Sequence, residues 1–187
     1  MQILISCAKT MAAASEIALP AATEAPFRAE AEQTVLQLAA LTTDELARLL
    51  RVNRTIAAEN RRRYLHFHDT PLLPAIAAYT GVVFKHIDPA GFSTDDFAYA
   101  QQHLNITSFL YGLLRPLDAI RSYRLEGDAV LPGPDDRTVF ARWPERLTDL
   151  LIDRVRADDG ILVNLASAEM KRLFDWRRVR REGRVIT

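Results

Sequence analysis

Two short apolar runs near the two ends of the chain constrain its fold most strongly. Residues 2–6 and 161–164 each contain three consecutive aliphatic side chains followed by a polar one. A run this short that is apolar on both faces is typical of a strand buried inside a sheet. Because helical patterns separate the two runs, the sequence predicts a mixed α/β protein.

Helix signals account for much of the remaining chain. Thr42 and Glu45 form a capping box, Ser93 and Asp96 form a similar pair, and Ser167 is expected to cap a later helix. The patterns predict helices over residues 28–41, 42–64, 72–79, 93–103, 117–121, 144–157 and 168–175. Strands or extended segments are expected over residues 82–84, 123–126 and 185–187, a turn at 105–108, and loops over 7–26 and 127–137.

The charge balance limits the kind of partner. The 187 residues include 24 basic and 24 acidic ones, so the formal net charge is zero. This argues against a generally basic nucleic-acid binder, and any anion site must be a local patch. Of the basic residues, 21 are Arg and 3 are Lys. Arginine suits bidentate phosphate contact, although GC-rich coding explains the same bias.

The sequence also indicates where the protein works. No apolar run approaches the roughly 20 residues that a membrane helix needs, and the first residues lack the features of a signal peptide. Cys7 is the one cysteine, so no internal disulfide can form, and we expect a cytoplasmic protein. His66 and His68 lack neighbouring ligands at suitable spacing, so no metal site is predicted. Nothing indicates a cofactor, a membrane partner or a stable protein partner.

Polar side chains follow both apolar runs. They are Ser6, Lys9 and Thr10 after the first, and Asn164, Ser167, Glu169 and Lys171 after the second. Ligands of α/β proteins gather beyond the carboxyl ends of the strands. Ser6, Asn164 and Ser167 are therefore the candidate anion-binding residues, and Lys9 adds a positive charge. A structural interpretation stays open, in which Ser167 only caps its helix and Glu169 stabilises the first turn.

The middle of the chain, up to Glu126, mixes polar and apolar side chains densely. Two helices joined by a tight turn near Gly112 would be similar to a helix-hairpin-helix, whose backbone N–H groups meet a DNA phosphate without reading bases. Arg115 and Arg124 could add bidentate phosphate contacts. The alternative is that Arg124 pairs with Glu126 or Asp118 in a structural network.

Several blocks of the sequence resemble the YaaA peroxide-stress family. They occur in the family's order and span nearly the whole chain, and the fourth is long and unusual. The blocks are Ile5–Thr10 (ISCAKT), Phe92–Phe97 (FSTDDF), Ala100–Leu104 (AQQHL), Leu110–Asp118 (LYGLLRPLD), Tyr123–Glu126 (YRLE) and Val163–Ser167 (VNLAS).

The resemblance implies a cytoplasmic bacterial protein, induced by hydrogen peroxide, that limits free intracellular iron and so limits oxidative damage. It also implies binding to double-stranded or branched DNA through a positively charged cleft. The implied fold is α/β (mixed α+β), with a central mixed sheet, surrounding helices and a helix-hairpin-helix element at about residues 93–121 of a single domain, 1–187. The nucleic-acid-binding candidates are then Lys9, Tyr111, Gly112, Arg115, Arg121, Arg124 and Lys171.

The chain departs from the family pattern at three positions. Cys7 stands where the family usually has proline, Asn105 where it has arginine, and Phe109 where it has glycine. A phenylalanine in the presumed hairpin disfavours the positive φ angle that glycine adopts readily. Family members also continue beyond Thr187, so we expect a chain truncated at its C-terminal end.

A second hypothesis is an enzyme that acts on a small phosphorylated or nucleotide-like substrate. Its pocket would contain Lys9, Arg124, Glu126, Asn164 and Ser167, which differ too much in type to form a simple basic stripe. Lys9 and Glu126 are the candidate catalytic residues, with Glu126 as a general base if burial raises its pKa. Convergence of these residues in one deep pocket favours an enzyme, whereas cations along an open groove favour DNA.

Overall fold

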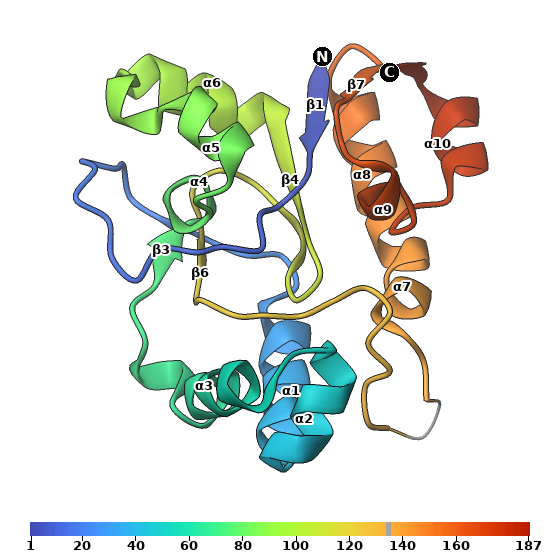
Figure 1. The fold of residues 1–187 in the computed structure, drawn as a ribbon. Helices are drawn as coiled ribbons and strands as arrows, with labels where there is room; N and C mark the ends of the chain where they lie inside the picture. Colours follow the sequence, from blue (N-terminus) through green and yellow to red (C-terminus); the bar gives the residue numbers. More distant parts are fainter. Residues whose placement is uncertain (134–135) are drawn as a thin grey trace.

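The fold is built on a five-stranded sheet whose middle strand is the first one in the sequence. A computed structural model describes residues 1–133 and 136–187. The strand order is β5-β4-β1-β7-β8 (Figure 1), and within it only β5 runs antiparallel to its neighbour. The strands are β1 (Gln2–Ile5), β4 (Leu104–Ser108), β5 (Gly112–Leu114), β7 (Ile161–Asn164) and β8 (Arg184–Ile186).

A smaller sheet and ten α-helices complete the described part of the chain. The smaller sheet has the order β2-β6-β3, from β2 (Thr23–Glu24), β6 (Asp118–Ile120) and β3 (Leu73–Pro74). The helices are α1 (Arg28–Ala39), α2 (Thr43–Leu50), α3 (Arg54–Leu65), α4 (Ala75–Ala78), α5 (Val82–Ile87), α6 (Thr94–His103), α7 (Val139–Arg142), α8 (Pro144–Ala157), α9 (Ala168–Lys171) and α10 (Trp176–Glu182).

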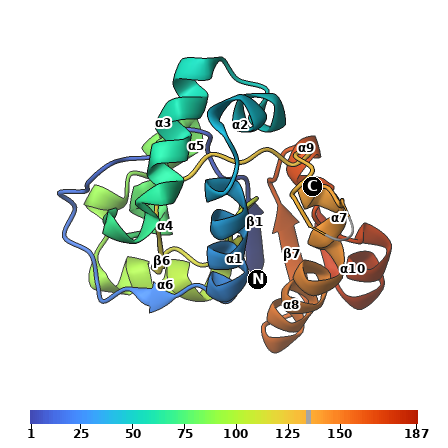
Figure 2. The same ribbon diagram turned by 90° about the horizontal axis from the view of Figure 1, so that it is seen from below.

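The helices occupy distinct places around the larger sheet. Helices α1 to α3 gather beyond the carboxyl end of β1, and α6 lies beside its amino end (Figure 1). Helices α8 and α10 lie next to β7 (Figure 2). The two ends of the sheet therefore have different neighbours. Helices α2 and α3 lie at one end, and the other end lies between α6 and α8.

One hydrophobic cluster joins the central strands to the helices. Leu4, Ile106 and Leu162, on β1, β4 and β7, are completely buried. Helix α8 is amphipathic, and its Leu147 and Leu151 are completely buried in the same cluster. Full burial of one aliphatic side chain stabilises a protein by about 1.5–3 kcal/mol. The two apolar runs of the sequence thus form the core strands, as predicted.

Several other sequence predictions are confirmed. Helices form within residues 28–41, 93–103 and 144–157, and the end of the chain contributes a strand. The loop predicted over residues 127–137 carries no helix or named strand where it is described, and residues 134 and 135 lie outside the described part. Among the helices that the structure describes, none combines the length and the apolar character that crossing a bilayer requires.

The predicted helix-hairpin-helix at about residues 93–121 is wrong in its second half. Helix α6 forms, but β4 replaces the expected turn and β6 replaces the expected second helix. Ile106 and Thr107 are β-branched and suit a strand, and β4 pairs along β1. The connection that follows belongs to a β-hairpin, in which the Tyr111 amide donates to Ser108 Oγ at 2.9 Å. Residues 93–121 therefore do not form the pair of helices whose connecting turn would contact a DNA phosphate.

Three further predictions, two of helices and one of a strand, need correction. The helix expected over residues 42–64 is split, because Arg51 adopts a left-handed conformation (φ 53°) that ends α2 and Asn53 then caps α3. The strand expected over residues 82–84 is instead the first turn of α5. The helix predicted over residues 72–79 is reduced to the single turn of α4, preceded by β3.

Gly112 provides a test of the β-hairpin. Its φ angle is +75°, and a Cβ atom there would lie 2.8 Å from Leu147 Cδ2 and 3.0 Å from Phe27 Cδ2. Gly160 has a similar φ of +77° but open space around it. We expect Gly160→Ala to lower the free energy of unfolding by about 1–2 kcal/mol and Gly112→Ala by about 1–3 kcal/mol more. Equal losses in urea unfolding would contradict the tight packing around the hairpin.

Candidate functional site

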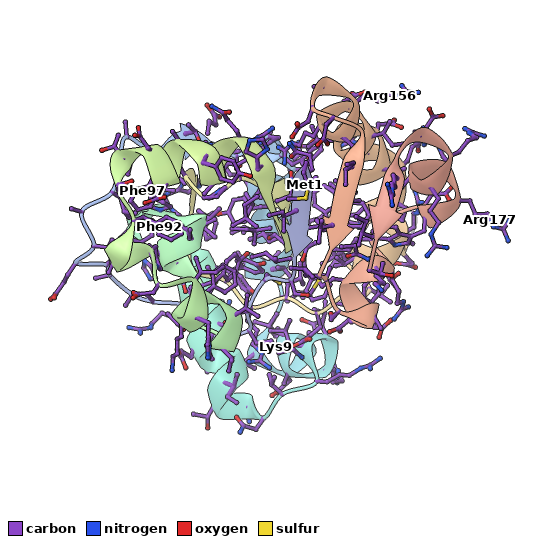
Figure 3. All side chains as sticks on the ribbon, turned by 90° about the horizontal axis from the view of Figure 1, so that it is seen from above. Met1, Lys9, Phe92, Phe97, Arg156 and Arg177 are labelled. Atoms are coloured by element: carbon purple, nitrogen blue, oxygen red, sulfur yellow. The ribbon has the colours of Figure 1, made fainter. Side chains whose placement is uncertain are left out.

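A pocket of about 250 Å³ opens at the carboxyl ends of β1 and β7. This is where the sequence predicts that the two polar segments meet. The lining residues are Ser6, Cys7, Ala8, Lys9, Phe109, Tyr123, Arg124, Leu125, Glu126, Ser167, Glu169 and Met170. Figure 3 shows Lys9 near the helices at this end of the molecule and away from Arg156 and Arg177.

Three charged side chains meet at the pocket. Glu126 Oε2 accepts from Lys9 Nζ at 2.9 Å, and Glu126 Oε1 accepts from Arg124 Nη2 at 3.3 Å. The Lys9 side chain is 62% exposed, whereas that of Glu126 is only 19% exposed. Two cations thus share one carboxylate, while a second acid, Glu169, also lines the pocket, so the lining as a whole carries no net charge. An exposed ion pair of this kind contributes only about 0–1 kcal/mol, so an anionic ligand can compete for the cations.

Buried tyrosines hold the segment that carries Arg124. The Tyr64 hydroxyl, which comes from α3, donates to the Arg124 carbonyl, and the Arg124 amide donates back to it at 3.4 Å. The Tyr123 hydroxyl lies 3.0 Å from that of Tyr79 and 2.8 Å from Ser108 Oγ. Burial raises the pKa of Tyr123 well above its ordinary value, so the hydroxyl stays neutral. These bonds fix the main chain on both sides of the pocket.

The predicted anion-binding residues have different roles. Ser6 Oγ accepts from the Ser167 amide at 2.9 Å, which joins the ends of β1 and β7. Ser167 Oγ accepts from the Met170 amide at 3.4 Å and caps α9, as the structural interpretation expects, and Ser167 also lines the pocket. Asn164 is buried and its Oδ1 accepts from the Ala166 amide at 3.1 Å. Asn164 therefore shapes the turn and does not line the pocket.

The structure separates the other DNA-binding candidates from this pocket. Arg115 donates to two main-chain carbonyls at the C-terminal end of α6, and Arg121 donates to two carbonyls in the turn after α3. Tyr111 and Gly112 are buried inside the protein, so neither reaches a partner at the surface. Lys171 lies on α9 but is not among the lining residues. The seven predicted residues therefore do not form one continuous surface, and that prediction is wrong. Of the seven, Lys9 and Arg124 both line the pocket.

Sequence analysis missed one cation near the pocket. A hollow of about 280 Å³ shares Lys9, Arg124 and Glu126 with the pocket and is also lined by Arg51. Arg51 is exposed and terminates α2 in the left-handed conformation. No local pattern predicts that Arg51 lies near Lys9. The two residues line the same hollow because α2 lies beyond the carboxyl end of β1 in the folded protein. The periodicity of α2 marks its buried face but not its neighbours.

The pocket also contains the single cysteine. Burial, more than any other cause, raises the pKa of the Cys7 thiol to about 12 from an ordinary value of 9.0. Cys7 is partly buried, and a thiol that stays neutral is a poor nucleophile, which agrees with the inert cysteine that the sequence suggests. Among the described residues, no three His, Cys, Asp or Glu side chains lie close enough together to hold a metal ion.

The Cys7 thiol predicts a specific alkaline sensitivity. Because its pKa is higher in the folded protein than in the unfolded chain, its contribution to stability is complete below pH 9 and is lost as the pH rises from 9 toward 12. We expect the unfolding free energy to fall by about 1 kcal/mol more between pH 8 and pH 10 in the unmodified protein than in Cys7→Ala. Urea unfolding measures this, and identical pH profiles would show that the thiol is accessible.

Comparison with known proteins gives a consistent picture. A family model described as peroxide stress protein YaaA matches residues 1–187. A UPF0246 protein of Bacteroides thetaiotaomicron is 57% identical over 189 residues, which cover 100% of this chain and 74% of that protein. Similar proteins occur in Phocaeicola vulgatus, at 52% identity over 189 residues, and in Crocosphaera subtropica, at 34% identity over 175 residues. In the latter case the match covers 93% of this chain and 70% of the relative.

Proposed function

The chain belongs to the peroxide stress protein YaaA family, and from that premise we propose that it acts in the peroxide stress response by binding DNA. In this proposal, Lys9 and Arg124 contact the phosphate backbone at the mouth of the pocket. Through this binding the protein limits the damage that free iron and peroxide cause, and it helps to keep intracellular free iron low. Its site of action is the cytoplasm.

The observation that carries this proposal is the shared carboxylate of Glu126. It holds Lys9 and Arg124 together at a surface opening, where one carboxylate serves as the ion-pair partner of both cations. Arg124 Nε is moreover buried without a hydrogen-bond acceptor among the described residues, which is costly for a charged group. A small rotation of the guanidinium toward a phosphate oxygen would satisfy this donor. Arginine and lysine side by side are well suited to one phosphodiester.

The number of cations sets the expected salt dependence. Two phosphate contacts predict that log K falls with log salt concentration with a slope of about −2, well below that of strongly basic proteins. Lys9→Ala and Arg124→Ala should each weaken binding to duplex and junction DNA by roughly tenfold and reduce the slope to about −1. Sequence preference should not change, because phosphates carry no base information.

Fluorescence anisotropy at several salt concentrations measures these effects. Arg177→Ala is the matched control, because Arg177 is also exposed but lies on another side of the molecule (Figure 3). It should bind DNA as the unmodified protein does. Absence of DNA binding at low salt, or an equal loss in the control, would rule out this interface.

A second candidate function is catalysis on a small phosphorylated or nucleotide-like substrate. The observation that favours it is that Lys9, Arg124, Glu126 and Ser6 converge on one pocket of about 250 Å³, which is too small for a duplex. Ser6 Oγ already accepts one hydrogen bond, so its own hydrogen is available to a ligand oxygen. Glu126, held by two cations, can orient Lys9 and Arg124 toward the substrate phosphate or accept a proton as a general base.

Nucleotide binding distinguishes the second candidate from the first. A nucleoside monophosphate that occupies the pocket should raise the melting temperature in a saturable way, and Lys9→Ala should abolish the rise. Glu126→Gln keeps the shape of the side chain but removes its charge, so it should keep the binding and lose any turnover. A panel of nucleotides and sugar phosphates without a thermal shift would argue against the enzyme.

A further inference from the structure

A second pocket lies at the opposite end of the sheet, beside the amino ends of β1 and β4. Its volume is about 460 Å³, and helices α6 and α8 form its sides. The lining residues are Gln2, Gln102, His103, Arg115, Asp153, Arg154, Ala157 and Asp158. None of them lines the pocket around Lys9, so any ligand here is independent of the proposed DNA contact.

Two guanidinium groups face this second pocket. Arg154 comes from α8, is only 8% exposed, and donates from Nη1 to Asn105 Oδ1 at 2.7 Å. Arg115 follows β5 and donates from Nη1 to the Gln102 carbonyl at 2.7 Å. A guanidinium has five N–H donors, so each of the two keeps others for a ligand.

Neither arginine has a carboxylate partner. No ion pair joins Arg115 or Arg154 to an acidic side chain in residues 1–133 and 136–187. The charge of Asp118 acts on both arginines, but its two oxygens accept from the Arg115 amide and from Thr23 Oγ1. The carboxylate of Asp118 is thus committed to other donors, and the two guanidinium groups share no direct counter-ion.

This arrangement is costly in the absence of a ligand. A buried charge without a partner destabilises a protein by several kcal/mol, and two adjacent cations repel each other. Burial, followed by the nearby charge of Arg115, lowers the pKa of Arg154 to about 10. An anion between the two groups would relieve both effects. The buried Arg154, which is hydrogen-bonded in place, is pre-organised to receive one.

The rim of the pocket limits the size of that anion. Asp153 is exposed at the rim, and Asp158 lies beside it, where it accepts from the Gln2 amide group at 2.8 Å and lies 2.9 Å from His103 Nδ1. Asp158 also pairs with the N-terminal ammonium of Met1 at 2.8 Å, so Asp153 is the rim carboxylate that would repel a long polyanion while leaving room for one compact anionic group. A nucleic-acid backbone is therefore disfavoured at this end of the sheet.

We propose that this pocket, which we call the Arg115–Arg154 site, binds the phosphate group of a small molecule. The two guanidinium groups contact its oxygens from opposite sides, and the Gln102 side chain lies within the same opening. The source of the phosphate is either free inorganic phosphate or a small phosphate ester such as a nucleotide. The site is separate from Lys9 and Arg124, and it holds its ligand whether or not the protein binds DNA.

Calorimetric titration with inorganic phosphate tests the site, with sodium chloride at equal ionic strength as the blank. Saturable binding is expected for the unmodified protein and for Lys9→Ala. Arg154→Met and Arg115→Met should each reduce the affinity at least tenfold, after circular dichroism shows that they fold. Because Lys9→Ala removes the proposed DNA contact alone, failure of one proposal is distinguishable from failure of the other.

A variant at the exposed rim keeps the test valid if the arginine variants do not fold. Asp153→Asn removes one negative charge without touching the core and should tighten phosphate binding by about two- to threefold. Competition by a nucleoside monophosphate identifies an ester as the source, whereas binding of inorganic phosphate alone identifies the free ion. No saturable binding by the unmodified protein, or an affinity unchanged in Asp153→Asn, would overturn the proposal.

Discussion

Parallel pairing of β1 with both β4 and β7 is the interaction on which the rest of the structure depends. It joins the first strand to segments about 100 and 160 residues further along the chain, as in the pairs Ile3–Leu104 and Gln2–Leu162. Closing such long loops costs entropy, which burial of the central side chains offsets. Because the paired strands run in the same direction, the segments that follow them emerge at one edge. This pairing brings together the segments that line the pocket around Lys9. No local sequence pattern reveals it, because the paired residues are far apart in the chain.

The electrostatics of that pocket follow from how its cations are paired, not from an abundance of base. The chain is neutral overall, and its arginines are mostly paired with carboxylates or main-chain carbonyls. At Lys9 and Arg124 a single carboxylate, that of Glu126, serves two cations. Arg115 and Arg154 lack even this, and they are partly or wholly buried. At each end of β1, two basic side chains thus lie together with fewer direct carboxylate partners than cations.

The sequence predicts those parts of the fold that depend on local chemistry. The capping boxes at Thr42 and Ser93 mark real helix starts, and the apolar runs mark real core strands. It fails where pairing decides the structure: the sequence predicts a turn at residues 105–108, whereas pairing with β1 and β5 makes this segment a strand. Within the pocket, Lys9 could be predicted from its place after a strand, and Glu126 from its place in a block that resembles the family. The support from Tyr64 could not, since it reaches across 60 residues.

The buried amide groups at the amino end of β1 have a consequence for how the chain tolerates insertions. The Asn105 amide donates to Gln2 Oε1 at 3.0 Å while its oxygen accepts from Arg154, so three polar side chains interlock between strands and helix. Sliding β1 by one residue would break this interlock and turn every β1 side chain to the opposite face. These hydrogen bonds thereby fix the register of β1 against its neighbours. We therefore expect length changes to be tolerated between residues 13 and 22, after the Met11–Tyr79 bridge, but not within the first five residues.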